Sequence, residues 1–284
     1  MLVPRPLDHL VLAQNSLAES TATYAGMGFV VAPKAVHPFG TANTVIQFAN
    51  RAYLELLAIE APEAIPDEPL AFSAVARDFL ADGEGVSMVA LTTRDAVADR
   101  VAFEQAGLAV GQALRFERPA TGPDGIDRPL AFSVVVTGDE RLKRAGFMVC
   151  QHHAPENFWF DDYQRHPNGA RRLDTVVMVA ADPADYHEFL TYFTGQHDIR
   201  STSLGIELRM GETGFEVLSP PAFAAFFGED GDAMINRVAG FTVEVDNLAA
   251  TRKYFDEHAV TYQMRAASLR RCSLRRGNRT CRSA

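Results

Sequence analysis

The chain has 284 residues, of which 47% are hydrophobic, and a formal net charge of −9 at pH 7. This length can hold one large or two medium domains, and the negative charge argues against a general affinity for nucleic acid. No stretch approaches the roughly 18 consecutive apolar residues that span a bilayer, and the N-terminus lacks the basic and apolar regions of a signal peptide. We therefore expect a cytoplasmic protein that binds neither nucleic acid nor membranes.

The last 21 residues differ in composition from the rest of the chain. Residues 264–284 contain seven of the 27 basic side chains and no acidic or aromatic residue, so residues 1–263 carry a net charge of −16. Cys272 and Cys281 lie in this segment, which leaves Cys150 as the only cysteine of the body and excludes an internal disulfide framework there. We expect this atypical arginine-rich tail to be disordered, either as an out-of-frame C-terminus, which we favour, or as an evolved basic arm.

Four segments share one plan, in which an apolar strand is followed by a polar cap, an amphipathic helix and another strand. They span residues 7–31, 86–111, 173–201 and 238–263. The first three continue into strand-rich stretches, so each reads as a β-α-β-β-β unit, whereas the fourth ends after its helix where the tail begins. A helical insertion over residues 69–82 separates the first two units.

Polar side chains that can accept a hydrogen bond from the free backbone N–H groups at a helix start predict where the helices begin. Glycines that can adopt a left-handed conformation predict where they end. The candidate caps are Asn15 or Ser16, Thr93, Asp182, and Asp246 or Asn247, and the candidate ends are Gly28, Gly107 and Gly195.

These units predict an α+β fold in two halves. Residues 1–155 hold the first two units, and residues 172–263 hold the third and the incomplete fourth. Residues 156–171, which are rich in aromatic residues, Pro and Asn, read as a linker. An exposed sheet edge in the second half would favour a homodimer.

One carboxylate stands in the middle of an apolar strand at residues 53–59. Alternation puts Tyr53, Glu55 and Leu57 on one side of that strand. An unpaired buried carboxylate is costly or takes up a proton, so Glu55 needs a partner. In the strand at residues 7–13, alternation likewise makes His9 a single polar ring on the face shared with Val11.

The sequence resembles the vicinal oxygen chelate superfamily, and specifically its glyoxalase-like domain proteins. The matching stretches are LDHLVL (7–12), GF (28–29), HPFGTAN (37–43) and YLELLAI (53–59). The resemblance implies paired modules that curl around a cleft and hold a divalent metal through their first and last strands. It also implies that His9 and Glu55 are metal ligands, and their N and O donors suit Zn²⁺, Ni²⁺, Mn²⁺ or Fe²⁺.

The second unit supplies further ligands poorly. Its alignment with the first unit puts Ser87 against His9 and Met148 against Glu55. His152, or else His37 on a loop, is a candidate to complete the metal set. The third unit keeps a carboxylate, Glu216, but has Thr175 in place of the histidine, and the fourth unit has Phe241 there. We therefore expect no metal in the second half.

We expect a metal-dependent isomerase or lyase that binds a small oxygenated molecule through vicinal oxygens. His9, Glu55 and His152 would hold the metal, and Glu55 and His152 would take part in catalysis. Dioxygenase chemistry fits less well, because it needs two histidines and a carboxylate and the second histidine is not on its usual strand. The alternative is a metal-free protein that binds a small molecule in the same cleft. The candidate substrate-binding residues are His37, Asn43, Tyr53 and Cys150.

Overall fold

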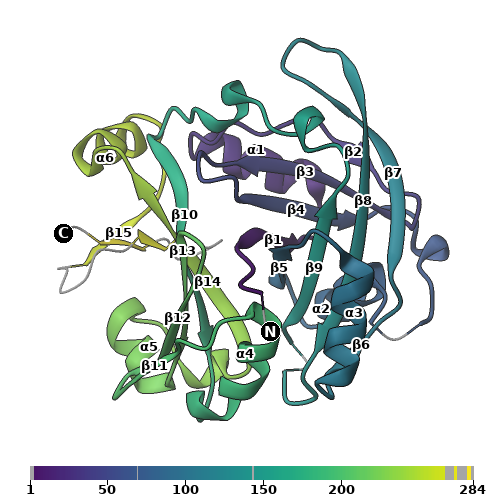
Figure 1. The fold of residues 1–284 in the computed structure, drawn as a ribbon. Helices are drawn as coiled ribbons and strands as arrows, with labels where there is room; N and C mark the ends of the chain where they lie inside the picture. The colour runs from purple at the N-terminus through teal and green to yellow at the C-terminus, as the bar shows by residue number, and fades with distance from the viewer. Residues whose placement is uncertain (1–2, 69, 143, 266–271, 274–279, 283–284) are drawn as a thin grey trace.

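Two curled sheets lie side by side, and the N-terminal segment runs between them (Figure 1). The computed structural model describes residues 3–68, 70–142, 144–265, 272–273 and 280–282. The expected α+β fold with curled sheets is confirmed. Within the described residues, no helix is both long and apolar enough to cross a bilayer.

The first sheet is built from residues 7–152. Its strands follow the order β2-β3-β4-β1-β5-β9-β8-β6, with β7 paired to β8. The strands are β1 (Leu7–Ala13), β2 (Ala35–Val36), β3 (Thr41–Gln47), β4 (Tyr53–Ile59), β5 (Gly85–Thr92), β6 (Ala109–Val110), β7 (Leu114–Thr121), β8 (Asp127–Gly138) and β9 (Gly146–His152). The helices are α1 (Leu17–Gly26), α2 (Phe72–Leu80) within the predicted insertion, and α3 (Ala96–Gln105).

The second sheet follows the order β11-β12-β13-β10-β14-β16-β17-β15. Its elements are β10 (Ala170–Val179), α4 (His187–Thr194), β11 (Arg200–Thr202), β12 (Gly205–Met210), β13 (Thr213–Leu218), α5 (Pro220–Phe227), β14 (Arg237–Val245), α6 (Leu248–Glu257), β15 (Gln263–Arg265), β16 (Cys272–Ser273) and β17 (Thr280–Arg282). The expectation of a disordered tail falls mostly outside the described residues; within the tail, the structure describes the last three short strands.

The helix caps follow the sequence with one exception. Ser16 accepts from the backbone N–H of Glu19, and Asn247 accepts from that of Ala250. The prediction of Thr93 as a cap is wrong, because Asp95 accepts from Ala98 N and begins α3. The Thr93 hydroxyl instead accepts from the N–H of Asp95, and so orders the residue that caps the helix.

One apolar core joins the two halves. It contains residues from both sheets, and across the boundary the ring of Phe193 lies 6.4 Å from that of Phe103 and 5.1 Å from that of Phe147. At its edge the buried guanidinium of Arg5 pairs with Asp99 at 2.6 Å and donates to the carbonyl of Phe193 at 2.9 Å. Neither half therefore has a complete core of its own.

The faces of the two sheets that point away from this core differ. In the second sheet, Phe223 and Phe227 of α5 cover Val177 and Val179 and form a closed apolar cluster. The corresponding face of the first sheet carries buried polar side chains beside its apolar residues. The second sheet also keeps buried polar side chains, among them Thr175, Glu216 and Thr242, so the apolar cover of α5 is what distinguishes its face.

His166, in the segment between the sheets, connects that segment to the first half. Its Nδ1 accepts from Val30 N at 3.0 Å, and its Nε2 donates to the carbonyl of Gln47 at 2.8 Å. The ring also packs edge-on against Phe29 and Phe48. Burial lowers the pKa of His166 below its ordinary value of 6.5, although the bond to Gln47 acts in the opposite direction.

Protonation of His166 should destabilise the fold, because it removes the acceptor for Val30 N. Since the folded-state pKa is depressed, its contribution is complete above pH 6.5 and is lost as the pH falls below that value. We expect His166→Gln to lower the free energy of unfolding at pH 7 by about 1–3 kcal/mol and to flatten its decline between pH 7 and pH 5. Urea denaturation at both pH values measures this.

His197→Gln provides the control, because His197 is exposed on the surface of the second half. An unchanged pH dependence in His166→Gln would show that His166 does not set the stability in this range.

Candidate metal and ligand site

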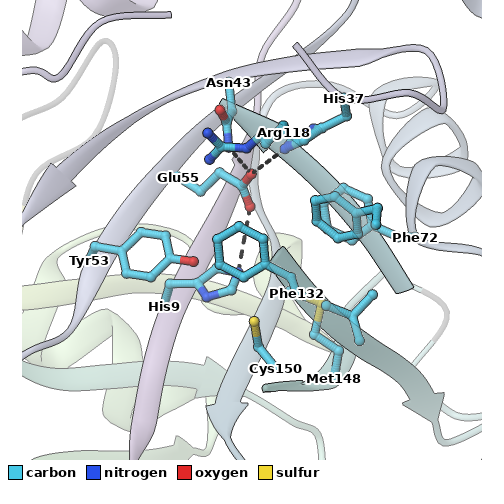
Figure 2. Close-up of a pocket in the computed structure, with 12 residues that line it drawn as sticks. His9, His37, Asn43, Tyr53, Glu55, Phe72, Arg118, Phe132, Met148 and Cys150 are labelled. Atoms are coloured by element: carbon cyan, nitrogen blue, oxygen red, sulfur yellow. Dashed lines mark hydrogen bonds and ion pairs between the residues drawn. The ribbon is translucent and has the colours of Figure 1, made fainter. Parts of the chain in front are cut away.

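Strand pairing brings the two predicted ligands together. The parallel pair β1 and β4 places His9 opposite Tyr53 and Val11 opposite Glu55. Because alternate residues share a face, His9 and Glu55 both point to the concave side of the first sheet (Figure 2). Their side chains meet at 3.5 Å between His9 Nε2 and Glu55 Oε2.

Glu55 is 4% exposed and has polar partners on three sides. Asn43 of β3 donates from Nδ2 to Glu55 Oε1 at 2.5 Å. Nε2 of His37 lies 3.9 Å from the same oxygen, so one imidazole faces each carboxylate oxygen. These contacts account for a carboxylate inside an apolar strand.

Asp8 holds the other side of the His9 ring. Asp8 Oδ1 lies 2.6 Å from His9 Nδ1, and Asp8 Oδ2 lies 3.1 Å from His152 Nε2 and accepts from the Thr92 hydroxyl at 3.0 Å. Burial alone would raise the pKa of Asp8, but the charges and hydrogen bonds of His152 and His9 hold it well below its ordinary value. Asp8 is therefore an anion that orients two imidazoles.

A break in strand register makes this arrangement possible. The pairing of β1 with β5 shifts between Leu7 and His9, which frees Asp8 from simple alternation. The second sheet has the same shift between Leu173 and Thr175, where Asp174 accepts from the hydroxyls of Thr175 and Thr242 at 3.1 Å. The bulged aspartate is thus common to both halves, whereas the imidazoles occur only in the first.

His37 precedes β3 and enters the site from a loop. Its Nδ1 lies 2.8 Å from the Thr41 hydroxyl, which turns Nε2 toward Glu55, and its ring stacks on Phe39 at 5.0 Å. Burial, followed by the positive charges of Arg118 and His9, lowers the pKa of His37 to about 3. The imidazole is therefore neutral at pH 7.

The structure places the predicted residues of β9 in two different environments. Cys150 and Met148 line the cavity with Glu55, whereas His152 is not among the residues that line it. His152 packs among Phe132, Phe158 and Trp159, and its Nδ1 has no hydrogen-bond partner. It contacts the site through Asp8. Ser87 also lies outside this cavity, and its hydroxyl donates to the carbonyl of Val11.

A second group of potential metal ligands overlaps the first. In the described part of the chain, only Asp8, His9 and Cys150 bring three such atoms within 4.8 Å of one another. Burial, with the negative charges of Asp8 and Glu55, raises the pKa of the Cys150 thiol well above its ordinary value. His9 is thus shared by two candidate ligand sets, one on each side of its ring.

The cavity is small, and its walls include the aromatic side chains Tyr53, Phe72, Phe116 and Phe132. One of its charged residues, Arg118 of β7, is 8% exposed and was not predicted from the sequence. Alternation with Phe116 was the available signal, since the two residues share a face while Arg115 and Glu117 face solvent. A guanidinium and a carboxylate therefore line the same small space.

The comparisons with known proteins agree with this architecture. Residues 7–194 match a family model described as a glyoxalase-like domain. A hypothetical protein from Staphylococcus aureus is similar at 14% identity and a TM-score of 0.59, over 76% of this chain and 86% of that one. A mutant of 4-hydroxymandelate synthase from Streptomyces coelicolor is similar at 13% identity and a TM-score of 0.54, over 90% of this chain and 75% of that one.

The two structural similarities, at these identities, show the fold alone. A search of curated protein sequences gave no significant match. The family model covers all strands of the first sheet and extends through α4, so its match includes every residue of the cavity. The chain therefore belongs to the glyoxalase-like domain family of the vicinal oxygen chelate superfamily.

Proposed function

We propose that the protein is a metal-dependent isomerase or lyase that binds a small molecule through vicinal oxygens in the cavity under the first sheet. The observation that carries this proposal is the buried Glu55 carboxylate, which has an imidazole nitrogen of His9 and one of His37 on opposite oxygens. Neutral imidazole nitrogens and carboxylate oxygens are the donors that Zn²⁺, Ni²⁺, Mn²⁺ and Fe²⁺ prefer.

On the Nε2 side of His9 the donors of His9, Glu55 and His37 would have to move closer together to hold an ion, because within the described residues only Asp8, His9 and Cys150 bring three such atoms within 4.8 Å of one another. A hydrogen bond from Nδ1 to a carboxylate, as His9 makes to Asp8, is the usual support of a metal-binding histidine. The opposite set is less suitable, because Asp8 already bonds His9, His152 and Thr92. His9, Glu55 and His37 would therefore hold the ion, which would act as a Lewis acid toward the oxygens of the ligand.

The remaining wall residues prepare the site for a developing negative charge. The rings of Phe72, Phe116 and Phe132 restrict water, which strengthens electrostatic interactions inside the cavity. Burial, followed by the charge of Asp8, raises the pKa of the Tyr53 phenol well above its ordinary value. Tyr53 therefore remains protonated and can donate to an enolate or oxyanion of the ligand.

Two other functions use the same cavity. A pair of histidines with one carboxylate is also the ligand set of Fe²⁺ oxygenases, and the position of His37 beside Glu55 favours that second candidate. A metal-free binding protein is favoured by Met148, which stands in β9 where the second unit would supply a ligand. Metal content and metal preference distinguish these functions.

Glu55→Gln should remove the metal, whereas Cys150→Ser should retain it. We expect about one divalent transition metal per wild-type chain after incubation with Zn²⁺, Ni²⁺, Mn²⁺ and Fe²⁺, because binding requires the deprotonated carboxylate. Inductively coupled plasma mass spectrometry of the untagged proteins measures the stoichiometry.

The reverse pattern, with metal lost in Cys150→Ser and kept in Glu55→Gln, would place the ion between Asp8, His9 and Cys150. An equal loss in His152→Gln would assign that histidine to the ligand set. Absence of metal from the wild type would support the metal-free binding protein, and selective uptake of Fe²⁺ would support the oxygenase.

Asp8→Asn should weaken metal binding without abolishing it, because Asp8 orients His9 and does not itself contact the proposed ion. The expected loss of Zn²⁺ affinity is about 10–100-fold, measured by competition with a chromogenic chelator. Asp174→Asn, at the matching bulge of the second sheet, is the control and should leave the affinity unchanged. An Asp8→Asn variant with wild-type affinity would contradict the support role.

A further inference from the structure

The guanidinium of Arg118 is buried at the cavity without an anionic partner. The side chain belongs to a residue that is 8% exposed, and among the described residues no ion pair joins it to a carboxylate. Its one hydrogen bond is the donation from Nη1 to the carbonyl of the adjacent Pro119 at 3.3 Å. Nε is buried with no hydrogen-bond partner at all, and the group lies 5.7 Å from the centre of the Phe132 ring.

Glu55 does not fill this role. Burial lowers the pKa of Arg118, and the charge of Glu55 only partly opposes this, because the carboxylate oxygens contact Asn43, His9 and His37 instead. A buried cation without a hydrogen-bonded anion is expensive, and folding alone gives no reason to retain one. The arrangement indicates a site whose missing partner is a ligand.

Asn43 offers a second open position beside Arg118. Its Nδ2 is used by Glu55, and its Oδ1 is buried without a partner. Asn43 and Arg118 are also the two residues that line both the Glu55 cavity and a neighbouring small cavity under β3 and β7. The unsatisfied donor and acceptor therefore lie on the wall between two small cavities.

We propose that Arg118 binds a carboxylate of the ligand, and that Asn43 Oδ1 accepts from a hydroxyl or amide of the same molecule. The guanidinium matches the planar carboxylate and can donate two hydrogen bonds to it. A single cation with Glu55 nearby favours a monoanion over a phosphate dianion, and the aromatic walls favour a short apolar body. That this ligand is the substrate rests on the function proposed above; carboxylate binding by Arg118 does not.

Carboxylates should bind the metal-free protein in preference to their uncharged amides. The probes are acetate, lactate and isobutyrate, each beside its amide and beside inorganic phosphate, titrated by calorimetry into protein treated with a chelator. We expect at least one acid to bind about tenfold or more tightly than its amide, and Arg118→Gln to remove that preference. Arg118→Lys keeps the charge but not the paired donors, so it should retain part of the preference.

Arg115→Gln is the matched control, because Arg115 lies on the same strand but faces solvent, where it pairs with Glu117. It should bind the acids as the wild type does. The proposal is overturned if no acid binds better than its amide, if phosphate binds more tightly than every carboxylate, or if Arg118→Gln keeps the preference.

The metal content of Arg118→Gln separates this proposal from the function proposed above. Unchanged metal binding with lost carboxylate binding supports both. Carboxylate binding that depends on Arg118 in a wild-type protein that takes up no metal supports the carboxylate site and contradicts the metalloenzyme.

Discussion

The burial of Glu55 is the constraint around which the first half is organised. A carboxylate in the middle of an apolar strand must be compensated, and the compensation comes from Asn43, His9 and His37 on separate elements. His9 must in turn be oriented, and Asp8 does this from a bulge in β1. The polar interior is therefore one connected set of contacts, in which each side chain fixes the position of the next.

The second half keeps a buried carboxylate but not the imidazoles: Glu216 of β13 is 7% exposed at the position that matches Glu55, and Thr175 stands where His9 does. Its bulged Asp174 is satisfied by two threonine hydroxyls instead of two imidazoles, and α5 covers the concave face with Phe223 and Phe227. The cover by α5 and the bonding of Asp174 to threonines together explain how the second half keeps the fold without the imidazoles of the site. The bulge is part of the strand architecture, and the histidines of the first half are additions to it.

Much of the fold and part of the site could be predicted from sequence. Alternation grouped Glu55 with Tyr53 and His9 with Val11, and the family resemblance implied that their strands lie together, as the parallel pairing of β1 with β4 has them. Alternation failed near Asp8, because the register shift at this residue cannot be recognised in the sequence. As a result, His152 contacts Asp8 and does not line the cavity. Arg118 was missed for another reason: its strand looks solvent-exposed, and only the alternation with Phe116 shows the inward face.

The core shared by the two halves has a consequence for energetic coupling. Because residues of both sheets pack into one cluster, separating the halves would expose apolar surface on each, and the chain should lose its structure in a single cooperative step. A small molecule held under the first sheet would then also slow amide hydrogen exchange in β13, a strand that contributes no residue to the cavity. In this way, the half without a site would still respond when the other half is occupied.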